Sequence, residues 1–217
     1  MQQVEFAKNG RFPRRVLCLG SHCDDIEIGC GGAVLKLLQQ DRNLEVLWVV
    51  FASNKRRAEE AKRSAQLFLK SCKKKKVIVK NFRDGFFPYS GAKIKDFFET
   101  LKPTFSPDIV FTHYRDDRHQ DHRLISDLTW NTFRDNLILE YEIPKYDGDL
   151  CAPNFFMPLS KEISAQKVDI ISECFKTQNG KQWFTRDTLT SLMRLRGVES
   201  RSPSKYAEAF YCRKIIL

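Results

Sequence analysis

Histidine and acidic side chains are concentrated in two short stretches of this sequence. The first covers residues 21–32 (SHCDDIEIGCGG) and the second covers residues 112–122 (THYRDDRHQDH). Together they hold every histidine of the chain: His22, His113, His119 and His122. Imidazole and carboxylate groups are zinc ligands in proteins, and a catalytic zinc site has three protein ligands and one position open to water. The two stretches therefore predict a metal site with hydrolytic chemistry.

The spacing within these stretches suggests a role for each side chain. His22 and Asp25 are three residues apart, so both can reach one ion from a tight turn, and His122 can complete the ligand set from the other stretch. Asp24 is then free to take a proton from a water whose pKa the metal lowers. The alternative is structural, because an aspartate in a loop often caps a helix. The grouping of all four histidines favours metal binding.

Short β-rich runs alternate with helical patterns over the first two-thirds of the chain. We expect strands at 14–19, 45–51, 76–79, 109–112 and 137–141, and helices at 31–40, 55–70, 92–101 and 124–133. In the last third we expect helices at 160–175 and 186–195 and a strand at 209–216. This alternation is typical of an α/β protein with a mostly parallel, twisted sheet flanked by helices. We expect residues 1–217 to form a single domain.

The predicted sheet brings the two polar stretches to the same place. They follow the first and the fourth expected strands, and ligands of such folds bind beyond the carboxyl ends of the strands. If these strands are neighbours, the two loops meet. Gly29, Gly31 and Gly32 lack the pattern of a phosphate-binding loop, and we interpret them as allowing a tight turn and close helix packing.

Composition limits the class and the partners of the protein. The 37 basic and 27 acidic residues give a net charge of +10, which fits either a solvated basic surface or an anionic, phosphorylated or nucleotide-linked substrate. No apolar run has the roughly 20 residues of a membrane span, and residues 1–13 lack the apolar region of a secretory signal. The seven cysteines, without CxxC spacing, predict no disulfide framework. We therefore expect a cytoplasmic protein.

The two stretches resemble the motifs of a known enzyme family. HCDDIEIGCGG is similar to the HPDD(E)xxxGxGG motif, and HQDH to the HPDH motif, of the LmbE-like or PIG-L zinc deacetylases. Weaker likeness extends to residues 57–65, 107–112 and 206–210. The resemblance implies a Rossmann-like fold and hydrolysis of an N-acetyl group on a glucosamine-type sugar.

By motif position, the resemblance implies that zinc is bound by His22, Asp25 and His122 and that Asp24 is the general base. His119 would then assist at the oxyanion or protonate the leaving amine, and Asp121 would orient a histidine. Two positions depart from the family, because Cys23 and Gln120 replace prolines of the motifs. Neither change removes a ligand. A thiolate ligand at Cys23 is disfavoured, because adjacent side chains of a tight turn point apart.

Residues after the second and third expected strands are candidates for substrate binding. Asp84 is either a turn residue or, as the resemblance implies, a partner of sugar hydroxyls. Arg57, Ser53 and Asn54 are further candidates at the same edge of the sheet. We interpret His113 as a residue that supports the metal ligands and does not bind the metal itself. For Trp183, Phe184 and Arg186 three interpretations stay open: a wall for the sugar, a packing contact or a homo-oligomer interface.

Three functions remain to be distinguished. We predict a zinc hydrolase that removes an N-acetyl group from a small amino-sugar substrate, free or linked to a nucleotide or lipid, with no nucleic-acid partner. A metal-dependent esterase or amidase on a non-sugar substrate would use the same residues. A non-catalytic Rossmann-like protein that binds a nucleotide or nucleic acid would use the basic surface instead. The sequence leaves open the exact substrate, the metal used in vivo and the oligomeric state.

Overall fold

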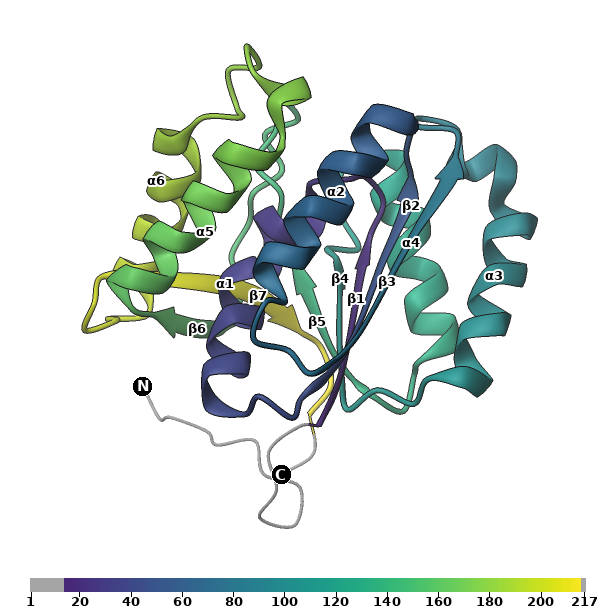
Figure 1. The fold of residues 1–217 in the computed structure, drawn as a ribbon, viewed down its shortest axis with the longest axis horizontal. Coiled ribbons are helices and arrows are strands. Elements are labelled where there is room, and N and C mark those ends of the chain that lie inside the picture. Colours follow the sequence, from purple (N-terminus) through teal and green to yellow (C-terminus); the bar gives the residue numbers. More distant parts are fainter. Residues whose placement is uncertain (1–13, 216–217) are drawn as a thin grey trace.

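The computed structural model describes residues 14–215, which form a seven-stranded sheet flanked by helices (Figure 1). The strands are β1 (Arg15–Gly20), β2 (Glu45–Ala52), β3 (Lys74–Phe82), β4 (Ile109–His113), β5 (Leu137–Tyr141), β6 (Phe155–Leu159) and β7 (Tyr206–Cys212). The helices are α1 (Asp25–Gln40), α2 (Lys55–Phe68), α3 (Gly91–Thr104), α4 (Gln120–Thr132), α5 (Lys161–Cys174) and α6 (Arg186–Glu199), with short 3₁₀ helices η1 (Phe87–Ser90) and η2 (Lys176–Gln178).

The strand order is β3-β2-β1-β4-β5-β7-β6. The first five strands of this order pair in parallel, whereas β7 runs antiparallel to both β5 and β6. The predicted α/β fold with a mostly parallel sheet is therefore confirmed. In particular, β1 and β4 are direct neighbours, with Val16 opposite Ile109 and Cys18 opposite Phe111.

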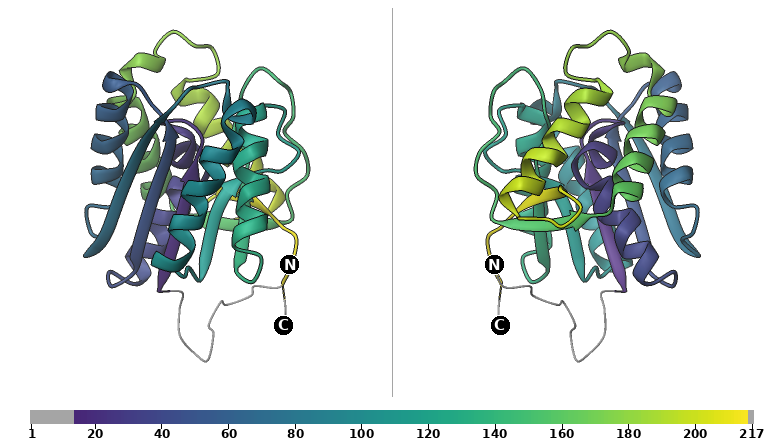
Figure 2. Two further views of the ribbon diagram at one scale, coloured as in Figure 1. Left: turned by 90° about the vertical axis from the view of Figure 1, so that its right-hand side faces the viewer. Right: turned by 90° about the vertical axis from the view of Figure 1, so that its left-hand side faces the viewer.

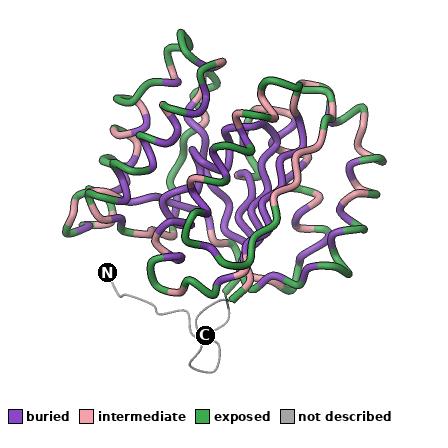
Figure 3. The backbone as a smooth tube through the Cα atoms, viewed as in Figure 1, coloured by how far each residue is buried: buried purple, intermediate pink, exposed green. Residues whose placement is uncertain are grey.

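Helices cover both faces of the sheet, which makes three layers. One core cluster lies between the sheet and α1, α2, α5 and α6, and a second lies between the sheet and α3 and α4. Figure 2 shows these two sides of the molecule in turn. The central strands are buried on both faces, as their nearly continuous apolar sequences require, and Figure 3 shows this buried interior.

The start of α1 corrects one prediction and confirms another. The helix begins at Asp25 rather than after a glycine-rich turn, so Gly29, Gly31 and Gly32 lie inside it and the predicted tight turn is wrong. Their role in close packing is confirmed. A Cβ on Gly29 would lie 2.2 Å from the ring of Tyr141, and one on Gly32 would lie 2.5 Å from Leu159. The glycines therefore let α1 press against the sheet.

Several other boundaries differ from expectation. Helix α4 begins at Gln120 rather than at residue 124, so the second motif enters its first turn. Helix α3 passes through Pro103 to Thr104, because Phe105 still donates a backbone hydrogen bond to Leu101 and closes the last turn. Strand β6 was not predicted. It contains Pro158, which an edge strand tolerates.

The predictions at the two ends of the chain are only partly testable. The final strand is β7 (Tyr206–Cys212) rather than 209–216, and Ile216 lies outside the described residues, as does the segment 1–13 considered for a signal. The extent of the domain, residues 1–217, stays a prediction. Within residues 14–215 no helix has the length and apolarity needed to cross a membrane.

A buried ion pair fixes α6 to the segment that follows β5. Arg196 donates from Nε and Nη2 to the two carboxylate oxygens of Glu142, at 2.6 and 2.7 Å, and both side chains are buried. Replacing Arg196 with methionine should destabilise the fold by about 3–5 kcal/mol, because Glu142 is left buried without a partner. Urea denaturation measures this loss. The exposed pair Arg186–Asp169 is the matched control, and Arg186→Met should cost about 0–1 kcal/mol. Equal losses in both variants would contradict the prediction.

Candidate metal centre

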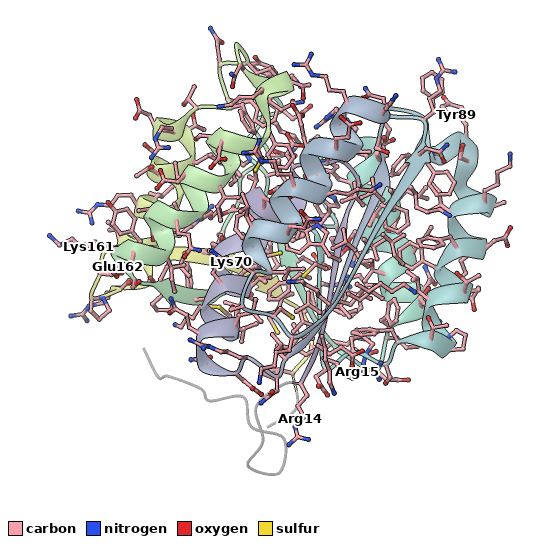
Figure 4. The ribbon with its side chains drawn as sticks, in the orientation of Figure 1. Arg14, Arg15, Lys70, Tyr89, Lys161 and Glu162 are labelled. Atoms are coloured by element: carbon pink, nitrogen blue, oxygen red, sulfur yellow. The ribbon has the colours of Figure 1, made fainter. Side chains whose placement is uncertain are left out.

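The two polar stretches meet at the carboxyl end of the parallel strands. Tyr89, in η1 after β3, marks this end in Figure 4, opposite Arg14 and Arg15 where β1 begins. Because β1 and β4 are neighbours, the turn after β1 packs on the loop after β4. Ser21 ties them together: its backbone N–H donates to His113 Nε2 at 2.9 Å, and its hydroxyl donates to the carbonyl of Asp121.

The three predicted ligands place one atom each in a small triangle. His22 Nδ1 lies 3.1 Å from His122 Nε2 and 3.3 Å from Asp25 Oδ2, and the latter two atoms are 3.5 Å apart. Zinc bound tetrahedrally at about 2.0–2.1 Å holds its ligand atoms roughly 3.3–3.4 Å from one another. All three residues are buried. The triangle therefore has the dimensions of one face of a tetrahedral zinc site.

Each histidine of the triangle also contacts a carboxylate through its other ring nitrogen. His22 Nε2 lies 3.3 Å from Asp121 Oδ2 and 3.1 Å from Asp84 Oδ1, and His122 Nδ1 lies 2.9 Å from Asp117 Oδ2. Carboxylates in this position fix the orientation and tautomer of metal-binding histidines. The resemblance implied that Asp121 orients a histidine, without naming which one, and in the structure the histidine that it contacts is His22. Asp117 was missed, although it stands only five residues before His122.

The charges in the cluster favour a positive charge at its centre. Burial raises the pKa of Asp25, but the imidazoles of His122, His22 and His113 outweigh it and hold the pKa well below its usual value. Burial and His113 lower the pKa of His122 to about 3. Burial also lowers the pKa of His22, but the carboxylates around it hold it well above its usual value. The surroundings thus favour a positive charge at His22, next to a carboxylate and a neutral imidazole, and zinc would have to displace the His22 proton in order to bind there.

Asp24 has one carboxylate oxygen without a hydrogen-bond partner in the described part of the chain. Its Oδ1 accepts a hydrogen bond from Arg57 Nη2 at 2.7 Å, whereas the buried Oδ2 has no partner. Burial raises the pKa of Asp24, and the charge of Arg57 opposes that rise. Asp24 is therefore held in place at one oxygen and can accept a proton at the other.

His119 caps the amino end of α4 and lies beside the triangle. Its Nδ1 accepts a hydrogen bond from the backbone N–H of Asp121, so its neutral ring carries the proton on Nε2. The ring centroid lies 4.8 Å from that of His22 and 4.6 Å from that of His122. Burial, followed by the nearby His22, lowers the pKa of His119. The side chain can therefore offer an N–H close to the metal ligands.

The two residues that differ from the family motifs, Cys23 and Gln120, each donate a hydrogen bond to a backbone carbonyl. Cys23 is fully buried, its thiol donates to the carbonyl of Ala52 at 3.3 Å, and burial raises its pKa to about 12. This agrees with the interpretation that it is not a ligand. Gln120 donates from Nε2 to the carbonyl of Gly85 at 3.0 Å. It thereby joins α4 to the loop after β3.

The residues predicted to bind substrate differ in exposure and in the hydrogen bonds that they already make. The Asp84 side chain is 62% exposed and reaches His22, so it borders the site directly. Arg57 is paired with Asp24. Ser53 donates to the carbonyl of Lys80 at 2.6 Å, and Asn54 accepts from the N–H of Arg57 at the start of α2. Their contacts with substrate stay predictions.

His113 is closer to the centre than expected from the sequence. It is fully buried at the end of β4, stacks on His122 with centroids 3.9 Å apart, and its Nε2 lies 3.2 Å from Asp25 Oδ2. Asp25, His113 and His122 also form a geometric group that could hold a metal ion. The sequence signal for this role of His113 was its position at the end of a buried strand, directly before the motif loop.

The aromatic residues of the last third act in packing. Phe184 is buried in the core cluster beneath α5 and α6, Trp183 packs against that cluster, and Arg186 pairs with Asp169 on the surface. Among the three interpretations, the packing contact is the one that these positions support for Phe184. The homo-oligomer stays untested.

Comparison with known proteins identifies the family. The profile of the PIG-L family, described as GlcNAc-PI de-N-acetylase, matches residues 17–133, more than half of the chain and both polar stretches. The chain belongs to this family.

Solved structures share the fold. The N,N'-diacetylchitobiose deacetylase of Pyrococcus horikoshii is 22% identical, with a TM-score of 0.67 over 93% of this chain and 84% of that one. A conserved protein of Thermus thermophilus is 19% identical, with a TM-score of 0.73 over 93% and 95%. The 4-carboxy-2-hydroxymuconate hydratase of Pseudomonas putida is 15% identical, with a TM-score of 0.73 over 94% and 98%. At these identities the likeness establishes the fold alone.

Proposed function

We propose that this protein is a zinc-dependent hydrolase that removes the N-acetyl group of an amino sugar of the N-acetylglucosamine type. The observation that carries the proposal is the triangle of His22, Asp25 and His122, with the partly unpaired carboxylate of Asp24 next to it. The family description, GlcNAc-PI de-N-acetylase, supports the reaction, and the chitobiose deacetylase with the same fold supports the substrate class.

The residues around the triangle suit the steps of amide hydrolysis. Bound zinc would polarise the acetamide carbonyl and lower the pKa of a water molecule. Asp24 would take a proton from that water as its oxygen attacks the carbonyl carbon. The Nε2–H of the neutral His119 would stabilise the developing oxyanion, whereas protonation of the leaving nitrogen by this side chain would need its imidazolium form. The carbon–nitrogen bond then breaks, the proton reaches the amine, and acetate and the free amino sugar leave.

The sugar would lie against the exposed side of the site. Asp84 is the strongest candidate to bind sugar hydroxyls, because its exposed carboxylate lies beside His22. Arg57, Ser53 and Asn54 stay candidates at the same edge. Whether the sugar is free or linked to a nucleotide or lipid, and whether the protein works in the cytoplasm, remain predictions from the sequence.

A substrate panel tests the proposed function. N-acetylglucosamine, diacetylchitobiose, UDP-N-acetylglucosamine and a lipid-linked N-acetylglucosamine are each incubated with the zinc-loaded protein, and acetate and free amine are measured. We expect both products in equal amounts from at least one substrate. The hydratase that shares the fold shows that the fold alone does not set the reaction. Hydrolysis of aryl esters without any amine release would favour the esterase instead.

Replacing Arg57 with methionine should move the acidic limb of the activity profile to higher pH. Burial raises the pKa of Asp24 and Arg57 opposes that rise, so loss of Arg57 raises the pKa further. Asp24 then becomes protonated, and inactive as a base, at a higher pH than in the wild type. The pH dependence of kcat/KM measures the shift. Arg56→Met, on the exposed side of α2, is the control, and an unmoved limb in Arg57→Met would contradict the role.

A further inference from the structure

The segment of residues 142–154, between β5 and β6, is hydrogen-bonded to the rest of the protein at two places. At its base, Arg196 binds the carboxylate of Glu142 and also donates to the carbonyl of Cys151 at 3.1 Å. Nearer the metal centre, Lys145 and Asp149 contact the loop after β4. The segment is thus held both by α6 and by the loop that carries the second motif.

Lys145 connects this segment to the carboxylate behind His122. Its Nζ donates to Asp117 Oδ2 at 3.0 Å and to Asp149 Oδ1 at 2.7 Å. All three side chains are largely buried. The ammonium group therefore neutralises two carboxylates that would otherwise repel each other in a poorly solvated position.

Asp117 also contacts two residues of the metal centre. The oxygen that binds Lys145 is also 2.9 Å from His122 Nδ1, and the other oxygen accepts from the backbone N–H of His119 at 2.8 Å. Asp149 adds a second link, because its Oδ2 accepts from the N–H of Arg118 at 2.7 Å. The side chain of Asp117 therefore connects Lys145 both to His122 of the triangle and to His119, which caps α4.

Two large exposed side chains belong to the same segment. Tyr146 is 71% exposed and Leu150 is 42% exposed, and both belong to the part of the segment between its fastened points. Because Lys145 and Asp149 contact the loop after β4, the backbone that carries Tyr146 and Leu150 lies beside that loop. Lys145 and Asp149 stand next to them in the sequence.

We propose that Lys145 is a positioning residue, which orients His122 toward the metal through Asp117 and docks the 142–154 segment so that Tyr146 and Leu150 border the substrate. This inference rests on the proposed metal site. Lys145 would then contribute both to zinc affinity and to substrate affinity. The substrate part that meets Tyr146 and Leu150 would be the group beyond the N-acetyl sugar.

The test compares zinc affinity and kinetics in two variants of Lys145. Lys145→Met should weaken zinc binding about 10- to 100-fold, the range typical of outer partners of metal ligands. Competition with a chromophoric chelator measures this without any substrate. At saturating zinc, KM should rise more than kcat falls. Lys145→Arg should restore zinc affinity to within about threefold, because it keeps the charge.

Two controls make the result decisive. Lys36 donates from Nζ to the carbonyl of Pro158 on another part of the fold, so Lys36→Met should bind zinc as the wild type does. If Lys145→Met does not fold, Lys145→Gln takes its place with the same expectation. Wild-type zinc affinity in a folded Lys145→Met or Lys145→Gln variant would overturn the inference. A wild type that binds no zinc would instead overturn the proposed metal site.

Discussion

Replacing Asp24 with asparagine should reduce hydrolysis by about 10²- to 10⁴-fold while the protein still binds about one zinc per chain. Asp24 directly precedes Asp25 but contributes no atom to the triangle, and Arg57 holds one of its carboxylate oxygens. Asparagine keeps the shape of the side chain and an oxygen to face Arg57, but it cannot take a proton from water. The loss should therefore fall on kcat, measured as acetate release, whereas zinc content is measured by elemental analysis.

A second aspartate provides the control for this prediction. Asp127 lies on the exposed side of α4, and Asp127→Asn should leave both activity and zinc content unchanged. Full activity in Asp24→Asn would show that another group is the base. Loss of zinc in Asp24→Asn would show that Asp24 is itself a ligand.

Replacing His122 with alanine should remove zinc together with activity. Its Nε2 is one of the three atoms of the triangle, and alanine offers no ligand atom in its place. We expect the affinity for zinc to fall by more than the roughly 10- to 100-fold typical of outer partners. A chelator competition titration gives the dissociation constant.

His119 is the matched control, because it belongs to the same HQDH motif and lies one turn away. His119→Ala should keep zinc bound and lower kcat, because in the proposed function its Nε2–H serves the reaction and not the ion. If His122→Ala kept zinc at wild-type affinity, the group of His22, Asp84 and Asp121, which does not include His122, would have to be considered as the metal site instead.

The sequence predicted that these side chains would lie together because its signals are local. His22, Asp24 and Asp25 stand together after one strand, and His122 follows another. The rule that parallel strands end at one edge was enough to bring them together once β1 and β4 were neighbours. Buried apolar strands and amphipathic helices are similarly visible in a sequence, which is why the parallel part of the sheet was predicted.

The parts that were missed depend on contacts between distant segments. The glycines after Asp25 signal a turn by themselves, and only the ring of Tyr141 on β5 and the side chain of Leu159 on β6 explain why they lie in a helix. Lys145 reaches Asp117 from an irregular segment, 28 residues away, with no periodic pattern. Strand β6 contains a proline, and its pairing with β7 at the edge of the sheet is what makes it a strand.

Titration of the metal-free protein with zinc tests the central claim most directly. Acetate release from the best N-acetylated amino sugar is measured after each addition of zinc. The proposed centre predicts that activity rises in proportion to bound zinc and levels off at about one zinc per chain, and that His122→Ala shows no such rise. Full activity in the metal-free protein, or zinc binding without any acetate release from the whole substrate panel, would contradict the claim.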